Sequence, residues 1–293
     1  REKHIIKVAL DELNLNDWYK LWSEQNIQDN SSGDLSVIEP DQILVNIKHA
    51  TFLQQPLSAL KVDAINDKQK WSADIDSDNL QANVEYRSGI PVRLDLDIKK
   101  LNFQAMDLSG LHTQKGEVSQ QLKQQSDNLQ EFYPEVFAEC TSCIYGNYDF
   151  SPLQLHLYPN KSSLNIDYIN IGTKRERTHI AGVWDQRHTN MIIDSLANKK
   201  NNIVKRLGFS SPIVYKKAEL NGNLNWVGAP WQFNFESLNG ALSASLKDGS
   251  ITEVSDKGAR LLSIFSLNAI RRSLNLEFND VFDKGLNFDD FTL

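Results

Sequence analysis

Residues 220–240 alternate between apolar and polar side chains with a period of two, and this pattern limits the possible folds more than any other feature. Leu224 and Trp226 fall on one side of the pattern, whereas Asn223 and Asn225 fall on the other. Such a period is typical of a β-strand with one buried face and one solvated face. After a Gly-Ala-Pro turn signal, the alternation predicts a second strand whose apolar side carries Trp231, Phe233 and Phe235.

Similar alternation recurs in several other segments, which are separated by turn signals rich in Gly and Asn. In residues 162–172 the pattern places Tyr168 on the same side as Leu164 and Ile166. These apolar faces need cover, because burying one Leu or Ile side chain contributes about 1.5–3 kcal/mol. The apolar side chains that we select as candidates for one surface are Val92, Leu94, Leu96, Ile98, Leu153, Leu155, Leu157, Leu164, Ile166, Leu224, Trp226, Trp231, Phe233 and Phe235.

Only a few segments predict helices. A helix is expected near the N-terminus over 15–26, and a polar helical insert is expected near 117–132. Apolar spacing also predicts a helix over 192–208. The clearest helical pattern covers 257–272, where two arginines close the segment as the helix dipole favours.

Composition and charge exclude several classes of protein. The chain is 40% hydrophobic and 24% charged, as in globular proteins, and its net charge of -7 argues against a nucleic-acid partner. No apolar run approaches the roughly 18 residues that a membrane-spanning helix needs. The chain begins at Arg1 and ends in a strand-like segment, so we expect it to be a fragment of a larger protein.

A search for catalytic and metal-binding motifs gives no candidate. The histidines are scattered, and the chain has no nucleophile elbow, phosphate-binding loop or dinucleotide fingerprint. Paired carboxylates such as Asp95 and Asp97 lie two residues apart on a strand, which favours a solvated face over acid-base chemistry. We therefore expect no enzyme, no catalytic residue, no metal site and no cofactor.

The two cysteines, Cys140 and Cys143, form the only CxxC motif of the chain. A structural zinc site usually needs four ligands, and a redox CxxC usually opens a helix, whereas turn and strand residues follow here. We expect a local disulfide in an oxidising compartment, with a pair of free thiols as the alternative and a redox enzyme as the least favoured reading.

One-sided strands with few helices to cover them leave two architectures open. The sheets can close on each other as a sandwich, or one sheet can curl into a groove that shelters an apolar ligand. Packing of protein on protein is the commoner solution, so the residues alone favour the sandwich.

The order of several motifs in the second half of the chain resembles that of the AsmA-like family of bacterial envelope proteins. The resemblance extends from Cys140 to Leu293, whereas residues 1–139 match only as a generic β-meander. The motifs that carry it are, in order, CTSC followed by Gly146, IAGVW, the WVGAPWQFNF block, GSITEV, the helix from Gly258, and LNLEFNDVFDKGLNFDD.

The resemblance implies a mainly β fold, in which a long, twisted antiparallel β-meander curls into a hydrophobic groove with a few short amphipathic helices. It implies the periplasmic part of a protein anchored in the inner membrane of a Gram-negative bacterium, in which the apolar side chains named above line a path for phospholipid acyl chains. Such a bridge would meet inner- and outer-membrane proteins at its ends. The alternative is a closed β-sandwich that scaffolds a partner or binds envelope glycan.

We expect two segments along the chain. Residues 1–139 would form a β-meander with the N-terminal helix and the polar insert. Residues 140–293 would form the AsmA-like segment with the helix near 257–272.

Overall fold

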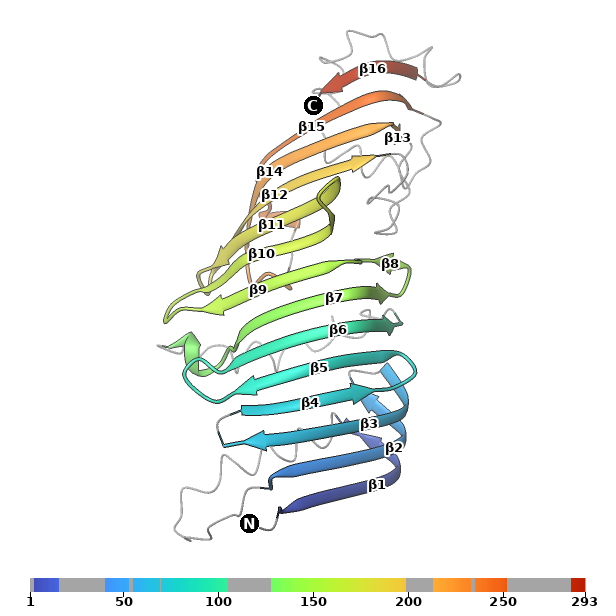
Figure 1. Cartoon of the computed structure of the whole chain (residues 1–293). Coiled ribbons are helices and arrows are strands. Elements are labelled where there is room, and N and C mark those ends of the chain that lie inside the picture. Colours follow the sequence, from blue (N-terminus) through green and yellow to red (C-terminus); the bar gives the residue numbers. More distant parts are fainter. Residues whose placement is uncertain are drawn as a thin grey trace. The chain divides into compact units, whose positions relative to one another are not determined.

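The computed structural model describes residues 3–15, 40–52, 55–68, 70–104, 128–198, 213–232, 235–251 and 286–292. The chain divides into two compact units, Arg1–Gly146 and Asn147–Leu293. The division falls after the CxxC motif, so this motif belongs to the first unit. Strands dominate both units, as expected for a mainly β fold (Figure 1).

The first unit is a sheet whose strands follow one another in chain order. Most neighbours are antiparallel, but β1 pairs with β2, and β6 with β7, in parallel. A parallel pair needs a long crossover connection, and the chain between the partners is correspondingly long in both cases. The elements are β1 (Ile5–Asn14), β2 (Gln42–Phe52), β3 (Gln55–Asp67), β4 (Lys70–Asp76), β5 (Leu80–Arg87), β6 (Arg93–Phe103), the 3-10 helix η2 (Leu129–Glu131) and β7 (Glu135–Tyr145).

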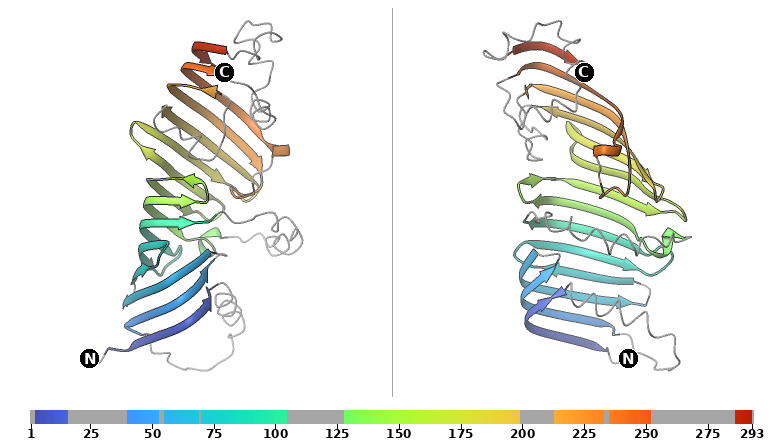
Figure 2. Two further views of the ribbon diagram at one scale, coloured as in Figure 1. Left: turned by 90° about the vertical axis from the view of Figure 1, so that its right-hand side faces the viewer. Right: turned by 180° about the vertical axis from the view of Figure 1, so that it is seen from behind.

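The core of the first unit lies where β2 and β3 bend. Ile47 and Ala50 of β2, together with Leu57 and Leu60 of β3, are at most 4% exposed. Residues three apart in a regular strand face opposite sides, yet Ile47 and Ala50 belong to the same core, as do Leu57 and Leu60. The alternation of sides therefore shifts by one residue between Ile47 and Ala50, and again between Leu57 and Leu60. Ala59, inside this shift, has a φ of 54°. The bend lets β2 and β3 curl, as Figure 2 also shows, and enclose a small core.

The second unit is an antiparallel sheet in which β9, β10, β11, β12, β14 and β15 are successive neighbours. The short β13 continues the line of β14 along one edge of β15, and β16 pairs with the other edge. The described strands form a linear order in each unit and do not close into a ring. The elements are β8 (Tyr148–Asp149), β9 (Leu153–Pro159), β10 (Leu164–Thr173), β11 (Glu176–Trp184), β12 (His188–Asn198), β13 (Ile213–Val214), β14 (Lys217–Val227), the 3-10 helix η3 (Phe235–Ser237), β15 (Asn239–Ile251) and β16 (Leu286–Thr292).

Two local predictions are wrong. Residues 192–198 belong to β12 and not to a helix, because pairing with β11 and β14 holds this segment extended. The segment after the Gly-Ala-Pro turn is not a strand, since residues 230–232 form a turn and Phe235 begins η3. The sheet is also not purely antiparallel.

The expected helix at 257–272 lies outside the described residues, as do nearly all of 15–26 and most of 117–132. Within the described part of the chain, none of the helices has the length and apolar character needed to cross a membrane.

Candidate functional site

The second unit presents one continuous apolar face, built from every other residue of its strands. In β14 the exposed fraction alternates strictly: Leu220, Gly222 and Leu224 are half-buried, Trp226 is buried, and the intervening residues are exposed. Cross-strand partners in a sheet point to the same side, so the register of the neighbouring strands defines the rest of this surface. We call it the apolar face.

Rows of paired residues run across the sheet from β14 through β12 and β11 to β10 and β9. Each row joins one apolar-face residue from each strand. The rows are Trp226–Thr189–Trp184–Leu164–Pro159, Leu224–Met191–Gly182–Ile166–Leu157, Gly222–Ile193–Ile180–Ile169–Leu155 and Leu220–Ser195–Thr178–Ile171–Leu153. Of the expected surface residues, Leu153, Leu155, Leu157, Leu164, Ile166, Leu224 and Trp226 therefore share one face.

The middle of the apolar face is neither sealed nor fully exposed. Leu155, Ile180, Ile193 and Leu224 are all half-buried. On the opposite side of the sheet, exposed polar residues such as Asn190, Asn221 and Asn225 predominate. The second unit therefore has one solvated polar side and one apolar side whose side chains are partly accessible to solvent.

A β-bulge in β10 corrects the expected position of Tyr168. The register shifts between Ile166 and Ile169, so that Ile169 and Ile171 join the apolar face. Tyr168 instead pairs with His156 on the polar side, which the simple alternation did not predict. A bulge adds one residue to one strand and so reverses the side on which every later residue lies.

The WVGAPW block closes one end of the apolar face. The indole Nε1 of Trp226 donates to the carbonyl oxygen of Ala229 at 3.2 Å, and the hydroxyl of Thr189 donates to that of Gly228 at 2.7 Å. Gly228, with a φ of +117°, allows the chain to turn back. The turn places Trp231 edge-to-face on Trp184, with ring centroids 5.4 Å apart. This cluster, Trp184, Thr189, Trp226 and Trp231, is the tryptophan rim.

At the other end of the same strands, polar side chains join the apolar ones, and we call it the polar end. Thr178 and Ser195, which are paired across β11 and β12, join their hydroxyls at 2.8 Å. Glu176 lies two residues before Thr178 and so on the same side of β11. The apolar face thus runs between an aromatic end and a polar end.

The first unit carries its own apolar side, on which Leu94, Leu96 and Ile98 lie. These three residues of β6 pair with Val136, Ala138 and Cys140 of β7. Val92 precedes β6 and is half-buried.

A disulfide joins Cys140 to Cys143 on this side of β7, and both residues are buried. Their Cα atoms are 5.8 Å apart, whereas three residues of extended strand span roughly 10 Å. The bond therefore fixes a local contraction of β7.

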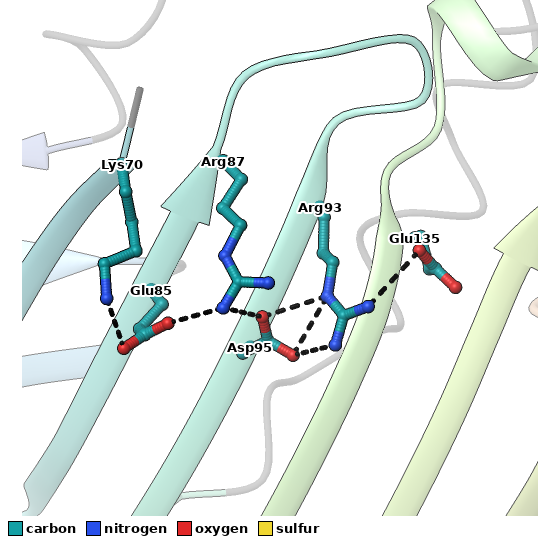
Figure 3. A network of polar contacts seen from close by, with 6 residues as sticks. All are labelled: Lys70, Glu85, Arg87, Arg93, Asp95 and Glu135. Atoms are coloured by element: carbon teal, nitrogen blue, oxygen red, sulfur yellow. Dashed lines mark hydrogen bonds and ion pairs between the residues drawn. The ribbon is translucent and has the colours of Figure 1, made fainter. Parts of the chain in front are cut away.

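The polar side of the first unit bears a charged network that links four strands (Figure 3). Lys70 and Arg87 both pair with Glu85 at 2.9 Å. Arg93 donates from Nε and Nη2 to Asp95 at 3.0 and 2.9 Å, and its guanidinium lies 4.2 Å from the ring centre of Phe137. The network comprises Lys70, Glu85, Arg87, Arg93, Asp95 and Glu135, and its formal charges cancel.

The hydrogen bonds from Arg93 hold the pKa of the Asp95 carboxyl below its ordinary value. Hydrogen bonds from Lys70 and Arg87 lower the pKa of Glu85 in the same way. A network whose charges are satisfied internally offers little to a charged ligand, so we interpret it as a clamp between strands. Among the described residues, no group of three His, Cys, Asp or Glu side chains could hold a metal ion.

Sequence reasoning missed much of the apolar face. Ile169 and Ile171 were hidden by the bulge, and Ile193 lies in a segment with helical spacing. Of the expected surface residues beyond the turn, Phe233 lies outside the described residues, and Phe235 is placed only as the start of η3.

Comparison with known proteins gives a family and one relative. The family described as YhdP protein matches residues 1–293. The chain is similar to the intermembrane phospholipid transporter YhdP of Escherichia coli (strain K12), with 26% identity over 162 residues. That match covers 54% of this chain and only 13% of the relative. No solved structure gives a significant match.

Proposed function

Since this chain belongs to the YhdP family, we propose that it is a segment of a conduit that carries phospholipid across the periplasm between the inner and outer membranes. The observation that carries the proposal is the continuous apolar face of the second unit. Acyl chains would lie on this face, and headgroups would stay in water beyond the strand ends. The relative named as an intermembrane phospholipid transporter supports the same substrate class.

The free-energy cost of moving a lipid through water explains why such a surface is needed. Each CH₂ group transferred from an apolar environment to water costs about 0.8 kcal/mol, so an acyl chain of about fifteen carbons costs on the order of 12 kcal/mol. A continuous apolar surface removes most of this barrier along the path. Transfer along it requires no bond to be made or broken, and this role needs no catalytic residue.

The partial exposure of the apolar face suits a transient occupant. A face intended only for protein packing would be expected to bury its large side chains, yet Leu155, Ile193 and Leu224 keep accessible surface. We infer that this surface is the wall of a hydrophobic groove. The apolar side of the first unit, which carries Leu94, Leu96 and Ile98, is a second surface that we propose for the same use.

The remaining parts of the proposal follow from the family. The chain would be the periplasmic part of a protein anchored in the inner membrane, with membrane proteins as partners at the ends of the full-length bridge. The disulfide between Cys140 and Cys143 suits an oxidising compartment such as the periplasm.

A glycan-binding role is the second candidate, because one observation favours it. The bulge in β10 gathers His156, Tyr158 and Tyr168 on the polar side, with the His156 ring 5.4 and 5.8 Å from the two tyrosine rings. Aromatic rings on a solvated strand face suit contact with sugars. Titration of soluble peptidoglycan fragments against the chain and its Tyr168→Ala variant tests this role. Saturable binding that the variant loses would support it.

Extraction and mass spectrometry of lipid that co-purifies with the chain tests the transport proposal. We expect phospholipid to be recovered with the folded chain. A folded chain that retains no phospholipid from a phospholipid-rich membrane extract, and whose apolar face is covered by its own residues, would contradict the proposal.

A further inference from the structure

The hairpin between β10 and β11 lies at the polar end of the apolar face. Gly172 pairs with Arg177, and Thr173 with Glu176, so Lys174 and Arg175 form the tip of the turn. Gly172 has a φ of +92°, and a Cβ at this position would collide with the carbonyl oxygen of Glu176. The glycine therefore permits the close approach that brings Glu176 back beside the end of β10.

One carboxylate oxygen of Glu176, Oε2, is buried and accepts no hydrogen bond from any residue that the structure describes. Two other carboxylates of this unit are paired: Asp167 contacts His156 at 2.9 Å, and Glu219 contacts Lys217 at 2.8 Å. A buried carboxylate oxygen without a donor is costly for the folded protein, so its presence calls for a donor that arrives from outside.

Arg177, which follows Glu176 in the chain, does not supply that donor. Arg177 lies next to Glu176 in β11 and therefore points to the opposite side of the sheet. There its guanidinium lies 3.7 Å from the carboxylate of Asp194, and its Nη1 donates to the carbonyl oxygen of Lys174 at 3.2 Å. The guanidinium of Arg177 is thus engaged on the other side of the sheet.

The same end of the face offers further acceptors beside Glu176. The hydroxyls of Thr178 and Ser195 share one hydrogen bond at 2.8 Å, which leaves lone pairs on both oxygens. An ammonium group has three N–H donors and no acceptor. A carboxylate oxygen and two hydroxyl oxygens on one side of a sheet match this donor set.

Two cations stand at the tip of the hairpin. The side chains of Lys174 and Arg175 are exposed, and no ion pair or hydrogen bond joins either side chain to another described residue. Both residues directly precede Glu176 in the chain. The hairpin therefore presents positive charge at its tip and, at its base, a carboxylate oxygen without a donor among the described residues, next to an apolar surface.

We infer that the β10–β11 hairpin is a headgroup site for phospholipids that carry a primary ammonium group beside their phosphate. The inference rests on the proposed function. The acyl chains lie on the apolar face and the phosphate meets Lys174 and Arg175. The ethanolamine arm, which extends beyond the phosphate, folds back so that its ammonium donates to Glu176 and the hydroxyls of Thr178 and Ser195. A phospholipid with a glycerol headgroup offers the same phosphate but no cation for Glu176, so the site discriminates by headgroup.

The test measures capture of two acyl-labelled lipids, phosphatidylethanolamine and phosphatidylglycerol, from vesicles by the purified chain. We expect roughly a tenfold preference for phosphatidylethanolamine, the size expected of one charge-assisted hydrogen bond. Glu176→Gln should abolish the preference without lowering the melting temperature, since the buried Oε2 has no hydrogen-bond donor among the described residues. The Lys174→Gln/Arg175→Gln double variant should lower capture of both lipids.

The matched control is Glu219→Gln, which changes an exposed glutamate on the polar side of β14 and should alter neither lipid. Capture of both lipids without preference, or an unchanged preference in Glu176→Gln, would overturn the headgroup site and leave the transport proposal intact. Failure of the folded chain to capture either lipid would overturn both. Binding of soluble glycerophosphoethanolamine as tight as that of the intact lipid would assign the site to a free headgroup instead of a lipid, which also overturns the inference.

Discussion

Trp184 and Trp231 meet edge-to-face, with ring centroids 5.4 Å apart and ring planes inclined at 64°. Trp184 is 6% exposed, whereas Trp231 is 58% exposed and reaches its partner only because the chain turns back after β14. The contact shows why the two tryptophans of the WVGAPW block have different roles. Trp226 belongs to the strand, and Trp231 covers the end of the apolar face.

Replacing Trp231 should cost little stability for so large a side chain. An edge-to-face pair contributes about 0.5–1.5 kcal/mol, so Trp231→Ala should lower the free energy of unfolding by about 1 kcal/mol. Trp184→Ala removes a buried ring and should cost about 3–5 kcal/mol. Urea unfolding of both variants checks the difference, and equal losses would show that the rim is not organised around Trp184.

Loss of the disulfide should affect stability but not lipid capture. Cys140 and Cys143 close a very short loop, for which chain entropy predicts about 2 kcal/mol of stabilisation. The Cys140→Ala/Cys143→Ala variant should unfold at lower urea and still capture phospholipid. A reducing agent should destabilise the original chain and leave the variant unchanged.

One result would contradict the structural role that we predict for the disulfide. A variant that keeps its stability but loses function would indicate a redox role for the two cysteines.

The charged network of the first unit should stabilise it in a pH-dependent way. The pKa of Asp95 is lowered in the folded protein by its hydrogen bonds from Arg93. Its contribution is therefore present above the ordinary carboxyl pKa and is lost as the pH falls through the lowered value. Asp95→Asn should cost about 1 kcal/mol near neutral pH, allowing for partial exposure, and should flatten the acid limb of the stability profile.

The matched control for Asp95→Asn is Asp97→Asn, which changes an exposed carboxylate two residues along the same strand. Thermal unfolding between neutral pH and pH about 3 separates the two variants, since these values bracket the ordinary carboxyl pKa. Identical profiles for both variants would show that the network does not clamp the strands.

A larger side chain at Gly222 should obstruct the apolar face. A Cβ there would lie 2.6 Å from the Cδ1 of Leu242, the residue opposite in β15. Gly222→Leu should lower stability by about 1–3 kcal/mol and reduce capture of acyl-labelled phospholipid several-fold. Asn221→Leu, which adds an apolar side chain to the polar side, should leave capture unchanged. Equal capture by both variants would argue against acyl chains on this part of the face.

Much of the fold follows from local sequence pattern, because a period of two is visible wherever a strand is regular and one-sided. Leu153, Leu155 and Leu157 alternate without interruption and share one face with Leu224 as the pattern predicts. The alternation gives the wrong side for residues that follow a β-bulge, because a bulge adds one residue to one of the two paired strands. Tyr168 follows the bulge of β10 and so lies on the polar side, although nothing in the adjacent sequence marks the bulge.

Other features depend on partners that are distant in the chain. Ile193 and Leu196 have helical spacing, but β11 and β14 on either side hold their segment as a strand. The parallel pairing of β6 with β7 depends on a crossover whose path the alternation does not encode. Trp231 lies in a turn, where its contact with Trp184 is decided by the fold and not by any period.

Site-specific photocrosslinking on β14 tests the central claim most directly, because neighbouring residues of this strand face opposite sides. A photoreactive phenylalanine analogue would replace Leu224 on the apolar face or Asn225 on the polar side, and adducts formed in cells would be analysed by mass spectrometry. The apolar face as a lipid path predicts phospholipid adducts at position 224 and few at position 225. Equal labelling at both positions, or labelling of position 224 by protein alone, would contradict it.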